Sequence, residues 1–261
     1  MKDTRIDFDR WAGTYDATRG ASPSVLRPLV EALALAAGRS LLDIGGGTGN
    51  FAAALSVAGF RTMHSDLSLA MASAAAAKHF GPVCVADAQH LPFADATIDC
   101  AVSVNVARHI PDRPRAFAEA RRVIRDGPFV VKVSTAETQR GDWVVEYFPR
   151  LLEHQPSYQP EALLAEELRG AGFTSVEVRR FIYEDALDGS FQALKRFPDR
   201  LLDAGTAANT AVFQRLPEAE LEAGFKRLRA DHASGALRDV IARYEPASQL
   251  YGDGSIFIAR T

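Results

Sequence analysis

Short apolar runs alternate with segments of helical pattern along most of this chain, and that alternation constrains its fold more than any other feature. The runs typical of buried strands are 40–44, 60–66, 82–87, 97–104, 128–134, 175–183 and 253–259. Amphipathic or alanine-rich segments of helical length separate most of them. A strand–helix–strand order of this kind predicts a mostly parallel sheet with helices on both faces. We therefore expect an α/β fold of the Rossmann-like, doubly wound type.

One long stretch departs from this alternation. Residues 184–250 show helical patterns with no strand between them, and we expect a helical cap inserted before the last strand and packed over one end of the sheet. The core then comprises residues 1–183 and 251–261, with residues 1–37 as an N-terminal lid segment. A chain of 261 residues with 47% hydrophobic residues can bury a core of this size.

A glycine-rich turn follows the first predicted strand, in the sequence LLDIGGGTGN at 41–50. In an open α/β sheet, ligands bind outside the carboxyl ends of the strands, which is where this turn lies. Its glycines do not fit the dinucleotide spacing G-x-G-x-x-G, and no Lys-Ser or Lys-Thr follows as in a P-loop. Asp43 would repel a pyrophosphate and attract a cation. S-adenosylmethionine, which carries an ammonium and a sulfonium, fits this turn, and Gly45, Gly46 and Gly47 would let the backbone approach it closely.

Two further aspartates end the next two predicted strands. Asp66 could accept hydrogen bonds from both ribose hydroxyls, and Asp87 could accept one from the adenine amino group, with the Ala88 backbone N–H nearby. Leu67 and Met71 could form apolar walls for the adenine. A single aspartate after a strand also fits a helix cap or a turn. Three carboxylates at successive strand ends, the first beside a glycine turn, favour a binding site.

Several segments resemble the successive motifs of class I S-adenosylmethionine-dependent methyltransferases. They are LLDIGGGTGN, SDLSLAM, VADAQHLPFADATIDCAVSVN and EARRVIRDGPFVV, and the small-molecule branch with the ubiquinone and menaquinone methyltransferases is the most similar. The resemblance covers roughly residues 8–183. It implies S-adenosylmethionine as cofactor and S-adenosylhomocysteine as product, and it gives Asp66 and Asp87 the ribose and adenine roles. The family's common RVL-x-PGG appears here as RVIRDGP, a departure confined to a turn.

The resemblance also assigns residues near the transferring methyl group. In FDRWAGTYDATRG (8–20), Tyr15 would cover the sulfonium and Arg19 would pair with the methionine carboxylate, although both also fit a surface segment packed on the cap. After the fourth strand, Asn105 would line the cofactor pocket. His109 is the candidate base and would also contact the acceptor. A base is needed for a hydroxyl or a carbon acid but not for a neutral amine, and His109 also fits a loop histidine bonded to backbone.

An aromatic-rich segment at 141–160 follows the fifth strand of the sheet. Trp143, Tyr147 and Tyr158 could form the walls of an acceptor pocket, or they could pack the cap against the sheet. A mostly apolar pocket with few polar groups suits a small organic acceptor, and so a role in biosynthesis or tailoring of a natural product.

The remaining features exclude other classes. The net charge of −3, without clustered Lys or Arg, argues against nucleic acid and membrane surfaces as partners. No apolar run approaches the roughly 20 residues that span a bilayer. The N-terminus lacks a secretory h-region, so we expect a cytoplasmic monomer or homodimer. No His, Cys or Asp spacing predicts a metal. Two alternatives stay open, a non-catalytic S-adenosylmethionine-binding protein and an NAD-dependent oxidoreductase.

Overall fold

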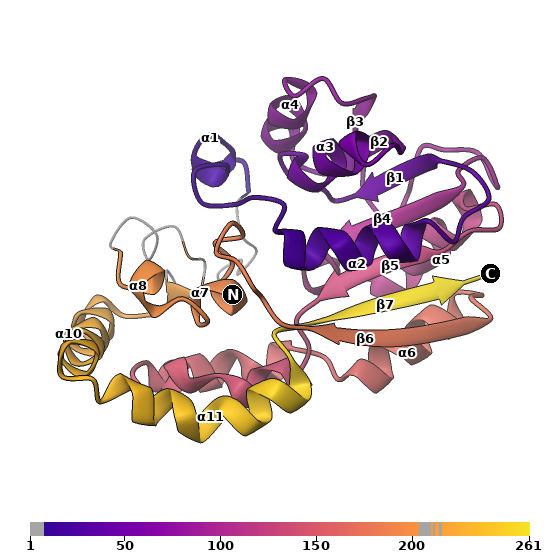
Figure 1. Cartoon of the computed structure of the whole chain (residues 1–261). Helices are drawn as coiled ribbons and strands as arrows, with labels where there is room; N and C mark the ends of the chain where they lie inside the picture. Colours follow the sequence, from indigo (N-terminus) through magenta and orange to yellow (C-terminus); the bar gives the residue numbers. More distant parts are fainter. Residues whose placement is uncertain (1–7, 204–209, 211, 214–215) are drawn as a thin grey trace.

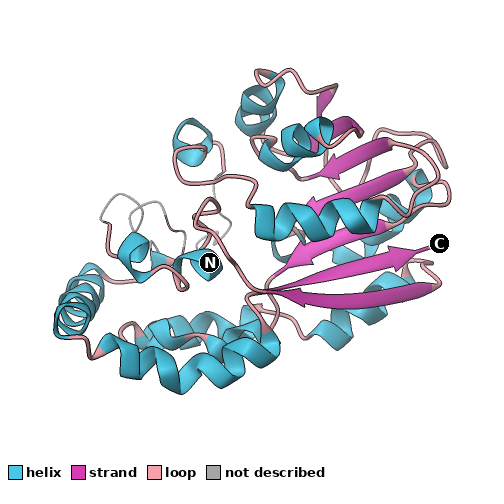
Figure 2. Ribbon diagram, in the orientation of Figure 1, coloured by secondary structure: helices cyan, strands magenta, loops and turns pink. Residues whose placement is uncertain are grey.

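The described residues form a seven-stranded sheet, which confirms the predicted fold class (Figure 2). The computed structural model describes residues 8–203, 210, 212–213 and 216–261, apart from the side chains of 154–157. The strand order is β3-β2-β1-β4-β5-β7-β6. The strands are β1 Ser40–Ile44, β2 Arg61–Asp66, β3 Val83–Val85, β4 Cys100–Val104, β5 Phe129–Val133, β6 Ser175–Phe181 and β7 Gly254–Arg260. β7 runs antiparallel to both of its neighbours, β5 and β6, and the other pairings are parallel.

Helices cover both faces of this sheet, as predicted (Figure 1). They are α2 Pro23–Leu33, α3 Asn50–Val57, α4 Leu69–Ala76, α5 Arg113–Val123 and α6 Glu161–Gly170. Phe117 of α5 and Leu168 of α6 are buried in an apolar cluster on one face. Leu29 of α2 and Leu55 of α3 are buried in a second cluster on the other face. These two clusters hold the carboxyl ends of the strands in fixed positions.

The strand order reverses between β1 and β4. From β1 the chain continues to β2 and β3 on one side, and it then returns to β4 on the other side of β1. In doubly wound sheets this reversal opens a crevice at the carboxyl ends of the two central strands. In Figure 1 the arrowheads of β1, β4 and β5 point toward the side on which α1 (Ala12–Tyr15) lies.

A cap with its own apolar core lies beyond that edge. It contains α7 Phe191–Leu194, α8 Pro198–Leu201, α10 Glu218–Ser234 and α11 Leu237–Tyr251, together with the 3₁₀ segments η2 Glu137–Gly141, η3 Trp143–Glu146 and η4 Pro149–Ser157. Phe148 and Leu151 are buried in one cluster with Leu194, Leu228 and Leu237. Residues 143–151, which we predicted as part of the core domain, therefore pack with the cap. Their aromatic side chains fill the space beneath α10 and α11.

Candidate functional site

A cavity of about 620 Å³ lies at the carboxyl ends of β1, β2, β4 and β5. The glycine turn and the ends of β2 and β3 line one side, which we call the glycine-turn side. The other side, which we call the cap side, is lined by the loop after β4 and by Tyr158, Asp188, Ser190, Phe191, Gln192, Thr210 and Val212. The crevice expected at the strand-order reversal is therefore present, and the cap extends it.

Close packing of neighbouring side chains requires glycine at two positions of the turn. A Cβ atom on Gly46 would lie 2.1 Å from Asp43 Oδ2 and 2.6 Å from His64 Cε1. Gly45 has a φ of +67°, and a Cβ there would come within 2.6 Å of the Val106 side chain. The turn is thus pressed between β2 and the loop after β4, which leaves its backbone facing the cavity.

Asp43 and His64 form a buried pair beneath this turn. The β1–β2 register places them side by side, and both side chains are fully buried. His64 Nδ1 lies 3.5 Å from Asp43 Oδ2. Burial lowers the pKa of His64, but the adjacent Asp43 carboxylate raises it more, so that the pKa lies above its usual value. Both Asp43 oxygens lack hydrogen-bond partners among the described residues, and Asp43 lines the cavity. The sequence analysis gave His64 no role.

Asp66 and Asp87 also line the glycine-turn side, as predicted. Asp66 accepts hydrogen bonds from the backbone N–H groups of Gly47 and Ser68, both at 2.8 Å, and its burial still raises its pKa. Desolvation raises the pKa of Asp87, but hydrogen bonds from Gln89 lower it below its usual value. The other residues predicted to bind the cofactor also line the cavity; they are Gly45, Gly46, Gly47, Leu67, Met71 and Ala88 on this side, and Asn105 in the loop after β4.

The N-terminal segment reaches over the glycine turn. Tyr15 lines the cavity, and its ring lies 3.9 Å from the position that a Cβ on Gly47 would take. Arg19 also lines the cavity, and it donates a hydrogen bond to the carbonyl of Gly189 in the loop after β6. The Gly189 N–H donates in turn to the carbonyl of Thr18 at 2.8 Å. The lid segment is therefore attached to the loop that leads into the cap.

Asp16 fixes the same segment to the core, which the sequence analysis did not anticipate. Its carboxylate accepts hydrogen bonds from Thr48 Oγ1 and Asn50 Nδ2. It also forms an ion pair with Lys78 Nζ at 2.8 Å. Desolvation raises the pKa of Asp16, but these partners lower it below its usual value.

His109 and Tyr158 both line the cap side, as predicted, and Arg108 connects them. Arg108 Nε donates to His109 Nε2 at 3.2 Å, and its Nη1 donates to Tyr158 OH at 3.2 Å. The ring of Phe8 meets the His109 ring edge to face, with centroids 5.3 Å apart. The Nε2 lone pair of His109 is therefore engaged by the Arg108 guanidinium.

Trp143 and Tyr147 do not line the cavity, so our prediction that they form its walls is wrong. Both are buried in the apolar core of the cap. Trp143 Nε1 donates to the carbonyl of Lys195 at 3.0 Å, and Tyr147 OH donates to Asp231 at 2.7 Å. The alternative interpretation, packing within the cap, holds because each ring finds a polar partner there for its N–H or O–H group.

Lys132 is a lining residue that the sequence analysis missed. It lies near the end of β5 in the run FVVKV and is fully buried. Its Nζ donates to Asn105 Oδ1 at 2.8 Å and to Tyr183 OH at 3.0 Å, and Tyr183 OH donates to Asp188 Oδ2 at 2.7 Å. A charged residue within an otherwise apolar strand was the feature of the sequence that could have identified it.

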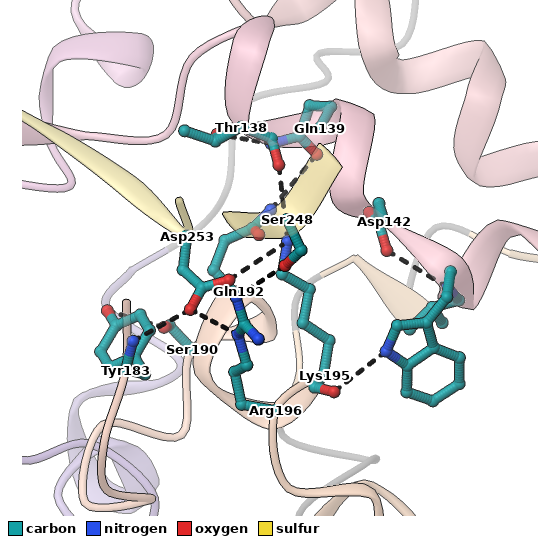
Figure 3. A network of polar contacts seen from close by, with 12 residues as sticks. Thr138, Gln139, Asp142, Tyr183, Ser190, Gln192, Lys195, Arg196, Ser248 and Asp253 are labelled. Atoms are coloured by element: carbon teal, nitrogen blue, oxygen red, sulfur yellow. Dashed lines mark hydrogen bonds and ion pairs between the residues drawn. The ribbon is translucent and has the colours of Figure 1, made fainter. Parts of the chain in front are cut away.

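A second buried polar network joins the cap to the sheet (Figure 3). Asp253, just before β7, accepts hydrogen bonds from Arg196 Nε at 2.8 Å and from the Tyr183 N–H at 2.9 Å, and Lys195 Nζ lies 3.6 Å away. Gln192 Nε2 donates to Gln139 Oε1 at 3.2 Å. Gln192 also lines the cavity, so this network supports the cap side of the site.

Within the described ranges, no helix is long and apolar enough to cross a membrane. In the same part of the chain, no group of three or more His, Cys, Asp or Glu side chains could hold a metal ion.

Comparison with known proteins connects this geometry to a family. A family model described as a methyltransferase domain matches residues 42–131. An uncharacterized methyltransferase of Mycobacterium avium is 42% identical over 104 residues, which are 37% of this chain and 39% of that protein. The chain thus spans about two fifths of the length of the curated relatives it matches.

Solved structures extend the likeness over nearly the whole chain. A proposed methyltransferase from an antibiotic biosynthesis pathway of Anabaena variabilis is 26% identical with a TM-score of 0.81, and the match covers 94% of this chain and 99% of that one. The phosphoethanolamine N-methyltransferase 2 of Haemonchus contortus, solved with S-adenosyl-L-methionine, shares the fold at 15% identity and a TM-score of 0.61, over 97% of this chain and 57% of its own. Residues 42–131 therefore match a methyltransferase domain, and nearly the whole chain shares the fold of solved methyltransferase structures.

Proposed function

We propose that this protein transfers the methyl group of S-adenosylmethionine to a small organic acceptor, with S-adenosylhomocysteine as the second product. The observation that carries the proposal is a single cavity with two unlike sides. Three strand-end carboxylates and a glycine turn lie on one side, and aromatic and cap residues lie on the other. A volume of about 620 Å³ is in the range of pockets that hold small molecules.

The glycine-turn side supports the cofactor assignment. The Asp43 carboxylate is paired with His64 but accepts no hydrogen bond from the described residues, and it borders the cavity, so it suits the ammonium group of the methionine portion. A carboxylate has about four acceptor positions, and Asp66 therefore keeps capacity for the ribose hydroxyls beyond its two backbone contacts. We assign Asp87 and the Ala88 N–H to the adenine, with Leu67 and Met71 as its walls. Asn105 lies between this side and the cap side.

The protein's contribution to the reaction is mainly positioning. The sulfonium supplies an activated methyl group and a neutral leaving group. The chain has to hold the acceptor in line behind that methyl group and to exclude water. Tyr15 lies above Gly47, where it would cover the methyl donor. One N–H group of Arg19 holds the lid to Gly189, and we assign the methionine carboxylate to the remaining donors of this guanidinium.

The cap side supports a small, largely aromatic acceptor. Phe8, Trp11, Tyr158 and Phe191 give it apolar surface, and Arg108 and His109 add polar groups. We assign His109 to acceptor contact. The relative from Anabaena variabilis is tied by its description to antibiotic biosynthesis, which supports a biosynthetic or tailoring role here as well. We also propose that the protein acts in the cytoplasm as a monomer or homodimer. The finer kinship with ubiquinone and menaquinone methyltransferases rests on the sequence motifs.

Calorimetric titration with S-adenosylhomocysteine tests the proposal, with NAD as the control ligand. We expect micromolar affinity for the former and none for the latter. Binding of NAD alone would favour the oxidoreductase alternative. Binding of S-adenosylhomocysteine without methyl transfer to any acceptor in a broad screen would favour the non-catalytic alternative.

A further inference from the structure

A continuous row of polar groups crosses the floor of the cavity. Asn105 Oδ1 accepts from Lys132 Nζ at 2.8 Å, Lys132 Nζ donates to Tyr183 OH at 3.0 Å, and Tyr183 OH donates to Asp188 Oδ2 at 2.7 Å. Asp188 also accepts from the Ser190 N–H at 3.0 Å. Asn105, Lys132, Asp188 and Ser190 line the cavity. The row begins beside the glycine turn and ends in the cap.

Its place in the site is fixed by packing at the ends of β4 and β5. Lys132 pairs with Val104 in the parallel register, and the Asn105 N–H donates to the Lys132 carbonyl at 2.8 Å. The next residue, Val106, packs directly against Gly45 of the glycine turn. Lys132 therefore lines the cavity next to the loop that packs on the glycine turn.

The surroundings of Lys132 disfavour its charged form. The side chain is fully buried, and no carboxylate of the described residues lies within ion-pair distance of its Nζ. Burial lowers the pKa of Lys132 to about 8. Among its neighbours, Asp188 and Asp253 raise this pKa, whereas Arg108 and Arg19 lower it. A neutral lysine amine has two N–H donors and one lone pair, so its bonds to Asn105 and Tyr183 use both donors and leave the lone pair for a proton.

We propose that Lys132 is the general base of the reaction and that the acceptor is an aromatic hydroxyl compound. This inference rests on the proposed function and specifies its substrate class. An aromatic hydroxyl matches the rings of the cap side and has a proton that must leave before methylation. His109 is the poorer base because its Nε2 accepts from Arg108.

In the proposed step, the Lys132 amine takes the proton of the hydroxyl and becomes an ammonium. The O–H electron pair stays on the oxygen as a phenolate. The phenolate oxygen forms a bond to the methyl carbon while the carbon–sulfur bond breaks, and that electron pair goes to sulfur, giving a neutral thioether. The ammonium is stabilised through Tyr183 by Asp188, and it returns its proton to water after the products leave.

Two small probes of matched shape test this inference. They are 4-nitrophenol, whose ionised form is coloured, and 4-nitroaniline, which has no acidic proton at working pH. Each is titrated into the wild-type protein saturated with S-adenosylhomocysteine, between pH 5.5 and 8. We expect the bound phenol to be ionised at pH values where the free phenol is neutral, and to bind at least about tenfold more tightly than the aniline at pH 7. This measurement needs no variant.

Two lysine variants locate the effect. Lys132→Met should abolish the preference for the phenol and the colour of the bound form, and should leave affinity for S-adenosylhomocysteine within about threefold of wild type. Lys195→Met removes another buried lysine, which faces Asp253 and does not line the cavity, and should keep both properties.

The inference is overturned if the phenol binds in its neutral form, if it binds no better than the aniline, or if it does not bind. The proposed function is unaffected by these outcomes as long as S-adenosylhomocysteine binds in the same samples. An ionised bound phenol that persists in Lys132→Met also overturns it and moves the base elsewhere, His109 being the next residue to replace. If S-adenosylhomocysteine does not bind to wild type, the proposed function fails and this inference fails with it.

Discussion

Replacing Gly46 with alanine is the sharpest steric test of the glycine turn. A Cβ atom there would clash with the Asp43 carboxylate, 2.1 Å from its Oδ2, and with the His64 ring, 2.6 Å from its Cε1. Both side chains are fully buried, so neither can swing into solvent. Overpacking of this kind typically costs 1–3 kcal/mol. For a chain of this length that corresponds to a fall in Tm of about 2–12 °C. Because the carboxylate would be displaced as well, affinity for S-adenosylhomocysteine should fall at least about tenfold.

Gly170→Ala is the matched control in the same chain. It adds the same methyl group at the end of α6, where no atom lies within 4 Å of the new Cβ. We expect an unchanged or slightly raised Tm and normal affinity, since alanine favours helix by roughly 0.5–1 kcal/mol relative to glycine. Thermal unfolding and calorimetry on both variants give the comparison. A Gly46→Ala protein as stable as Gly170→Ala, with normal affinity, would refute the packing of the turn described above.

Three further predictions concern individual side chains. Asp66→Ala should weaken S-adenosylhomocysteine binding by about 1–3 kcal/mol in calorimetry, and unchanged affinity in a folded variant would remove Asp66 from the ribose site. His109→Ala should lower the rate of methyl transfer less than about tenfold while raising the acceptor KM, whereas a loss of about 10²-fold would return the base to His109. Burial raises the pKa of Asp142 to about 6. Between about pH 4 and pH 6 the folded state therefore keeps a proton on this carboxyl that the unfolded state has lost, and the free energy of unfolding should fall as the pH rises through this range. Asp142→Asn should remove that dependence and be more stable than wild type at pH 7; parallel Tm curves for the two proteins from pH 4 to 7 would contradict it.

The sequence predicts the side of the site that belongs to the sheet. Asp66 ends β2 and Asp87 lies just after β3, and the parallel order brings such ends to one edge. An aspartate at the end of a strand is a local pattern, so it can be recognised in a single sequence. The strand limits are also close, although 82–87 shortens to Val83–Val85, an edge strand paired only with β2.

The sequence does not predict the cap side, for reasons of tertiary packing. Aromatic residues such as Trp143 fit a cap core and a pocket wall equally well, and only the position of the Lys195 carbonyl decides between them. Lys132 and Asp188 are 56 residues apart in the chain and are connected by hydrogen bonds through Tyr183 OH. No periodic pattern in the sequence predicts such a contact. The pairing of His64 could not be predicted from the sequence because its partner, Asp43, lies on the neighbouring strand β1.

The position of β7 has a consequence for how this domain is made. β6 pairs with β7 alone, and β7 follows the whole cap in the chain (Figure 1). During synthesis β6 therefore has no strand partner, and the edge of β5 that β7 covers is unpaired, until the cap has emerged and β7 can insert between them. Such long-range pairing slows folding and exposes strand edges to aggregation. A truncation before Gly254 would thus remove the strand through which β6 joins the sheet, rather than a dispensable end.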